Sequence, residues 1–161
     1  MKKLLLNPLS MLVCGLLLGV LSRLFDIYTE ILGNVFSRLA VWILLGTLIA
    51  VYSPTKWKAV LNIFPFCIGM LAAYYAVAIM THGVYGEQYI IGWTVFAFCS
   101  PIFAYITWMA KEKGKRPKLI ACGILCVSVL SSFLFRGTPI LDFILDGVLL
   151  YVLFFKKIER E

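Results

Sequence analysis

Six long apolar stretches, separated by short segments rich in turn-forming residues, constrain this chain more than any other feature of its sequence. A helix that crosses a bilayer needs roughly 17–25 mostly apolar residues, because the hydrocarbon core is about 30 Å thick. The chain has 62% hydrophobic and only 14% charged residues, far from the composition of a soluble domain. We therefore predict an all-α polytopic integral membrane protein, one helical domain over residues 1–161. Its six predicted spans are about 9–25, 35–52, 59–80, 90–109, 119–135 and 140–155.

The first apolar stretch follows Lys2 and Lys3, as in a secretory signal peptide. It continues to Leu21 without a small-residue cleavage site, and Leu12 and Val13 before Cys14 do not fit a lipoprotein signal. We expect this helix to be retained in the mature protein.

The basic residues are sorted between the two ends of the predicted spans. Cytoplasmic loops of membrane proteins carry an excess of lysine and arginine. Alternating spans from a cytoplasmic N-terminus place 12 of the 15 basic residues inside and only Arg23, Arg38 and Arg136 outside. We predict cytoplasmic N- and C-termini and location in a bacterial inner membrane. The net charge of +7 then needs no nucleic-acid partner. Residues 111–118 are interpreted as a loop that contacts lipid head groups or, alternatively, docks a partner.

The remaining charged residues gather near the opposite surface. Charges inside spans are costly and are usually paired or functional. Asp142 and Asp146 are four residues apart and share a helix face, so both need partners. We expect Arg38 or Arg136 to pair with Asp146, and Arg23 with Asp26 on its own helix. This group is either a structural ion-pair network or an outward pocket, in which arginines hold a small anionic ligand or Asp146 exchanges a proton. Its members are Arg23, Asp26, Arg38, Arg136, Asp142 and Asp146.

Small residues and prolines mark further features of the spans. Gly15 and Gly19 form a GxxxG pattern, which predicts close packing of a helix within the protein or against a partner protein. Pro65 and Pro101 remove backbone hydrogen bonds and predict kinks, freeing carbonyls such as that of Ala97. Asn62 and Ser100 stand nearby as polar partners for such carbonyls.

The short segment between the third and fourth spans contains His82, Tyr85 and Glu87. It is interpreted either as a lid or, with Trp93, as an aromatic belt at the membrane surface. A single histidine argues against a multi-histidine metal centre, and the five cysteines lie within predicted spans, where they serve packing. We therefore predict no metal, no cofactor and no structural disulfide.

From Lys2-Lys3 to Lys156-Lys157, the chain resembles small multi-span bacterial membrane families that have no assigned function, and this resemblance implies no activity. In size, number of spans and the small-residue face at Gly15 and Gly19, it also resembles the S components of energy-coupling-factor vitamin transporters. That second resemblance implies a substrate-binding membrane component that works with a partner.

Three functions follow as hypotheses. The leading one is a non-enzymatic binding or transport component, which needs a partner for energy because the chain has no nucleotide-binding loop. The second is an accessory or scaffold protein that assembles with another membrane protein, or with a second copy, through the Gly15 and Gly19 face. The third is an intramembrane lipid-modifying enzyme that uses Asp142 or Asp146 as acid or base. Metalloprotease, hydrolase and CxxC motifs are absent from the sequence, so we expect no enzyme.

Overall fold

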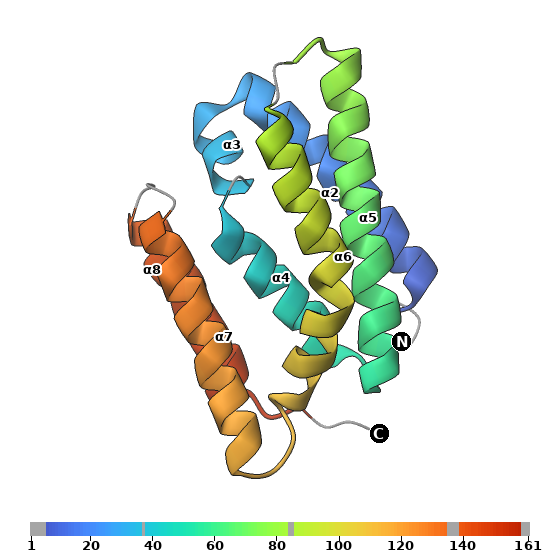
Figure 1. Ribbon diagram of the computed structural model, residues 1–161. Coiled ribbons are helices and arrows are strands. Elements are labelled where there is room, and N and C mark those ends of the chain that lie inside the picture. Colours follow the sequence, from blue (N-terminus) through green and yellow to red (C-terminus); the bar gives the residue numbers. More distant parts are fainter. Residues whose placement is uncertain (1–5, 37, 84–85, 135–138, 159–161) are drawn as a thin grey trace.

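The computed structural model describes residues 6–36, 38–83, 86–134 and 139–158, and all regular structure within these ranges is helical. Four helices are long and apolar enough to cross a membrane. Three shorter helices and a π-helical segment, η1, complete the described chain (Figure 1). The elements are α2 (Pro8–Tyr28), α3 (Glu30–Phe36), α4 (Leu39–Tyr52), α5 (Lys56–Met80), α6 (Glu87–Met109), α7 (Lys115–Leu134), α8 (Pro139–Leu150) and η1 (Tyr151–Phe155).

The prediction of an all-helical, membrane-like protein is confirmed. Large apolar side chains such as Leu17, Phe98 and Leu130 are more than half exposed on the outer faces of α2, α6 and α7. In water, such faces would be a large cost in free energy, whereas lipid tails accept them. The described helices therefore present the surface that a bilayer requires.

The predicted span 35–52 was wrong as one continuous helix. The structure ends α3 at Phe36 and begins α4 at Leu39, with Arg38 in an extended conformation. The reason is the buried Arg38 side chain, which forms an ion pair with Asp142 on α8. At about 1.5 Å per residue, the 14 residues of α4 are shorter than a typical hydrocarbon core.

Local signals explain where the two most closely packed helices begin. Asn7 and Ser10 form a reciprocal capping box at the start of α2, and Pro8 occupies the first turn, where its missing N–H costs nothing. At the start of α5, the hydroxyl oxygen of Thr55 accepts a hydrogen bond from the Lys58 N–H at 3.2 Å. Capping residues therefore define both starts.

Helices α2 and α5 pack backbone against backbone. A Cβ atom at Gly15 would overlap the carbonyl oxygen of Phe66, and one at Gly19 would overlap that of Met70. From the other side, a Cβ at Gly69 would lie 2.9 Å from the carbonyl oxygen of Leu12. The GxxxG face is thus buried within the protein, as the internal-packing interpretation predicted, and is not available to a partner.

Helix α4 connects two groups of helices. On one side lie α2, α5 and α6; on the other lies the antiparallel pair of α7 and α8 (Figure 1). Leu44 of α4 packs with Ala121 of α7 and Leu149 of α8, and Trp42 of α4 packs with Met11 and Phe66. The two apolar clusters therefore meet at α4.

Except for Arg23 and Arg38, the basic residues that the structure describes lie at one end of this arrangement, which we call the lysine-rich end. It contains the start of α5, the α6–α7 connection and the end of η1 (Figure 1). There the Lys111 Nζ donates hydrogen bonds to the carbonyl oxygens of Val152, Leu153 and Lys156 at 2.9, 3.0 and 2.7 Å. Lys111 thus ties the end of α6 to the end of the chain's last described helix.

Both intrahelical prolines lie where the sequence places them, within α5 and α6. The Ser100 hydroxyl donates to the Ala97 carbonyl at 2.7 Å, which supplies a partner to the carbonyl that Pro101 frees. Asn62 does not serve Pro65 in the same way: its amide donates to Ser53 Oγ at 3.0 Å and to the Leu6 carbonyl at 3.4 Å. Its polar group stabilises the contact between the start of α5 and the preceding turn.

Candidate functional site

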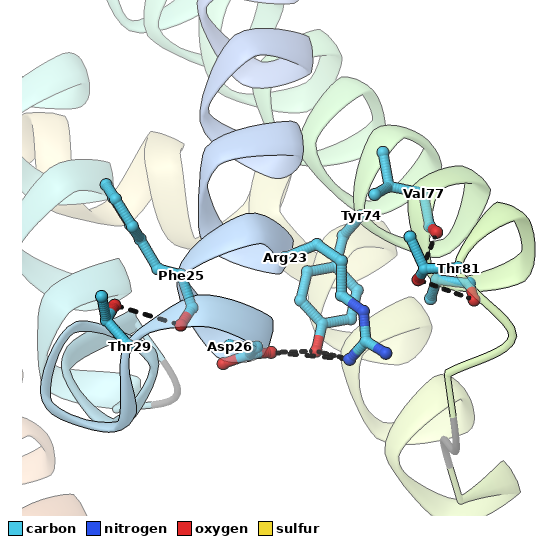
Figure 2. Close-up of polar contacts among 8 residues, drawn as sticks. Arg23, Phe25, Asp26, Thr29, Tyr74, Val77 and Thr81 are labelled. Atoms are coloured by element: carbon cyan, nitrogen blue, oxygen red, sulfur yellow. Dashed lines mark hydrogen bonds and ion pairs between the residues drawn. The ribbon is translucent and has the colours of Figure 1, made fainter.

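Arg23, Asp26 and Tyr74 form a polar cluster at the end of the bundle opposite the lysine-rich end, which we call the Asp26 end. The Tyr74 hydroxyl donates to Asp26 Oδ2, and Arg23 Nη1 lies 3.5 Å from the Tyr74 hydroxyl oxygen (Figure 2). Arg23 Nη1 is 3.9 Å from Asp26 Oδ2, and its guanidinium carbon lies 5.6 Å from the centre of the Tyr74 ring. The predicted association of Arg23 with Asp26 therefore includes Tyr74 of α5.

The guanidinium of Arg23 extends from α2 toward the connection between α5 and α6 (Figure 2). A Cβ at Gly83 would overlap Arg23 Nη2, so a larger residue there would require the end of the Arg23 side chain to move. The preceding residue, His82, has a φ of 48°, in the left-handed region. Arg23 therefore packs against the segment that leads into α6.

A second polar group joins α4, α7 and α8. Arg38 donates to Asp142 in a buried ion pair, both side chains being less than one-tenth exposed. One turn further along α8, Asp146 accepts a hydrogen bond of 2.5 Å from the Ser128 hydroxyl of α7. Arg38 thus pairs with Asp142, not with Asp146 as we had expected, and Arg136, the other expected partner, lies outside the described residues.

A cavity of about 710 Å³ opens at the Asp26 end, between α2, α3, α4, α5 and α6. This volume lies within the usual range for small-molecule sites, about 300–1,000 Å³. Among the described residues that line it, Asp26 alone carries a charge, and Ser22 and Gln88 add polar groups. Arg23, Arg38, Asp142 and Asp146 are not part of the lining.

Aromatic residues from three helices make up half of the other residues that line the cavity. Trp42 and Trp93 meet edge to face with ring centres 6.4 Å apart, and Trp93 meets Phe96 at 5.9 Å. The Trp42 indole N–H donates to the Phe36 carbonyl at 2.8 Å, which fixes the ring at the end of α3. The aromatic residues on α4, α5 and α6 that line the cavity are Trp42, Tyr74, Tyr75, Tyr89, Trp93 and Phe96.

The segment predicted as a lid or belt lies beside this cavity. Gly86 and Tyr89 line it, while His82 and Glu87 are exposed and Tyr85 lies outside the described residues. Sequence reasoning missed Tyr74 and Trp42 as site residues. The available signal was the antiparallel order of the predicted spans, which brings the end of the third beside the starts of the second and fourth.

No group of three or more histidine, cysteine, aspartate or glutamate side chains suited to a metal ion occurs among the described residues. The chemistry of the cavity is therefore that of aromatic faces, one carboxylate and a few hydrogen-bonding groups.

Comparison with known protein families finds one family that matches most of the chain. A family of unknown function, DUF6518, matches residues 1–133. The chain belongs to this family. The match covers every residue that lines the cavity, whereas Asp142 and Asp146 of this DUF6518 protein lie beyond it. No curated protein and no solved structure matches the chain significantly.

Proposed function

We propose that this DUF6518 protein is a non-enzymatic binding or transport component of a bacterial inner membrane, with its ligand site in the cavity at the Asp26 end. The carrying observation is the cavity itself, which combines a ligand-sized volume, aromatic walls and one carboxylate. Asp26 lines the site directly and Arg23 is joined to it through Tyr74, whereas Arg38, Asp142 and Asp146 stabilise the neighbouring helices.

The proposal includes six spans with both termini in the cytoplasm. The four long helices supply four spans, α4 supplies a short one, and α8 with η1 supplies the last. In this arrangement the lysine-rich end faces the cytoplasm, as the positive-inside rule requires. The cavity then opens toward the outer side of the membrane.

A cysteine-labelling experiment tests this orientation. Glu87→Cys lies at the Asp26 end and Lys113→Cys at the lysine-rich end, and both positions are exposed. In intact cells, a thiol reagent that does not cross membranes is expected to label Glu87→Cys and to spare Lys113→Cys until the membrane is opened. The unsubstituted protein measures labelling of the five native cysteines. Labelling in the reverse order would refute the orientation.

The alternatives are less well supported by the arrangement of residues. An accessory protein was expected to use the Gly15 and Gly19 face, which α5 occupies. An enzyme using Asp142 or Asp146 would need a substrate beside them, but Asp142 is paired with Arg38 and neither acid lines the cavity. A binding role requires a space for the ligand, and the cavity supplies one.

A ligand-stabilisation screen on purified protein tests the binding role. A compound class that fills the cavity is expected to raise the unfolding temperature, since a ligand bound only by the folded state stabilises it. Trp93→Leu, which alters the cavity wall, should lose the effect. Phe98→Leu is the matched control, because Phe98 is an aromatic residue of the same helix that is 63% exposed on its outer face. The absence of any compound that distinguishes the two variants would refute the proposal.

A further inference from the structure

The charge on the lining of the cavity is that of an acidic side chain. Asp26 is the only charged residue among its described lining residues, and its carboxylate is negative. The sequence suggested an anionic ligand because three arginines were expected near the opening, yet neither Arg23 nor Arg38 contributes to the lining. An anion in the cavity would face a carboxylate and the electron-rich faces of aromatic rings, both of which repel it.

Arg23 pairs with Asp26 from outside the lining of the cavity. Its closest approach to Asp26 is 3.9 Å, at the outer limit of an ion pair, and its guanidinium packs beside Gly83 and the face of Tyr74. The Asp26 side chain is 21% exposed and that of Arg23 is 11% exposed, so the acid is the more accessible of the two. The Asp26 carboxylate therefore borders the cavity, whereas the Arg23 guanidinium lies outside its lining.

The aromatic residues strengthen this preference. A cation within about 6 Å of a ring centre is attracted to the face of the ring, and aromatic cages bind quaternary ammonium ligands in this way. The cavity offers two tryptophans and three tyrosines from α4, α5 and α6 around one acid of α2. Arg23 already lies over the Tyr74 ring in this manner, so the site itself contains one contact of the expected kind.

We propose that the ligand of this cavity is a lipophilic organic cation, which binds with its charge near Asp26 and the aromatic wall that includes Trp42 and Trp93. This inference rests on the proposed function, because it names the class of molecule that the cavity binds. It assigns Asp26 as the residue that selects the charge of the ligand and Trp93 as a residue that contributes to the same selection through its ring.

The test uses two probes of matched shape and opposite charge, tetraphenylphosphonium and tetraphenylborate. Binding to the purified full chain in detergent is measured by thermal stabilisation and by quenching of tryptophan fluorescence. The cation is expected to bind about tenfold more tightly than the anion, a ratio within the range of one carboxylate and one or two cation–π contacts. Equal binding, or tighter binding of tetraphenylborate, would overturn the proposal.

Substitutions test which residues cause the preference for the cation. Asp26→Asn keeps the shape of the side chain and should reduce cation affinity about tenfold while leaving or improving anion affinity. Glu112→Gln is the matched control, because Glu112 is an exposed acid at the lysine-rich end, and its affinities should stay within about twofold of the native values. A loss of cation affinity as large in Glu112→Gln as in Asp26→Asn would show attraction by overall charge and would refute the role of Asp26.

A second substitution keeps the proposal testable if Asp26→Asn fails to fold. Trp93→Leu retains an apolar wall but removes the ring, so it should weaken the cation several-fold and affect the anion less. If it weakens both ions equally, the ring contributes apolar contact alone, and the role of Trp93 in selecting the charge is refuted. If neither ion binds more tightly to the native protein than to Trp93→Leu, the proposed binding function fails with it.

Discussion

Helices α2 and α5 meet through glycines, whereas α4, α7 and α8 meet through buried polar and charged groups. At the first contact, Gly15 and Gly19 bring two backbones so close that a methyl group would overlap a carbonyl oxygen. At the second, Arg38 and Asp142 bury opposite charges, and Ser128 supplies a hydrogen bond to Asp146. Lipid tails are as apolar as leucine, so helices in a bilayer gain little from apolar burial alone and need one device or the other.

The two contacts differ in how they should respond to a single substitution. Close packing loses part of its stability when a small group is added, because neighbouring atoms must move apart. A buried ion pair loses much more when one member is removed, because the remaining charge stays in a medium of low dielectric constant. Substitutions at the two contacts therefore test whether the free energy of unfolding responds differently at each.

Replacing Arg38 by methionine is expected to have the largest effect. Asp142 would remain buried without its cation, so the free energy of unfolding should fall by about 3–5 kcal/mol. Unfolding by sodium dodecyl sulfate in mixed micelles, followed by circular dichroism, measures this change. Combining Arg38→Met with Asp142→Leu should recover most of the loss, since neither member of the pair then remains as an uncompensated buried charge. A double variant as unstable as the sum of the two single variants would contradict the interpretation.

Replacing Gly15 by alanine should have a smaller but definite effect. The added methyl group meets the backbone of Phe66, which has little freedom to move, so a loss of about 1–3 kcal/mol is expected. The matched control is Gly123→Ala in α7, where no atom lies within 4 Å of the new methyl group. The control should leave stability unchanged or raise it by up to about 1 kcal/mol, because alanine favours the helix. Equal effects at the two positions would remove the distinction between a packed and an open glycine.

The glycine contact could be predicted from sequence more fully than the ion pair, for a physical reason. GxxxG spacing places two small residues on one helix face, and this geometry depends on one helix only. Pairing Arg38 with Asp142 depends on how α4 is rotated relative to α8, which no local pattern specifies. The same limit applies to the break before α4, because the apolar stretch from 35 to 52 gives no sign that Arg38 leaves the helix to reach its partner.

The cavity shows the same limit more strongly. Its acid, Asp26, was recognised as a candidate because charged residues are rare near spans and therefore conspicuous. Its aromatic wall was not, since Trp42 and Tyr74 are two of many aromatic residues in an apolar sequence and their convergence depends on tertiary packing. The sequence therefore indicates that Asp26 and its charged neighbours lie near one membrane surface, but not which of them face the cavity.

Within the second contact, Ser128→Ala tests the hydrogen bond apart from the ion pair. Removing the hydroxyl deprives the buried Asp146 carboxylate of its donor at 2.5 Å, so a loss of about 1–3 kcal/mol is expected, near the lower end if water enters the space. Ser132→Ala is the control, because the Ser132 hydroxyl donates at 3.2 Å to the Ser128 carbonyl in its own helix, and its effect should be within about 0.5 kcal/mol. The same unfolding assay applies, and a larger effect for Ser132→Ala would contradict the assignment.

The smallest expected effect concerns the Ser100 hydroxyl, which donates within its own helix and also forms a hydrogen bond with the Cys67 thiol of α5. Pro101 leaves the Ala97 carbonyl without its backbone donor, and the Ser100 hydroxyl supplies one at 2.7 Å. Ser100→Ala should therefore cost about 0.5–1.5 kcal/mol in the native chain. In a Pro101→Ala background the backbone N–H at position 101 is restored, so the same serine substitution should cost much less. A double-mutant cycle in the unfolding assay measures the difference. If Ser100→Ala costs the same in both backgrounds, the hydroxyl does not replace the missing backbone donor, and its value lies in its packing against α5.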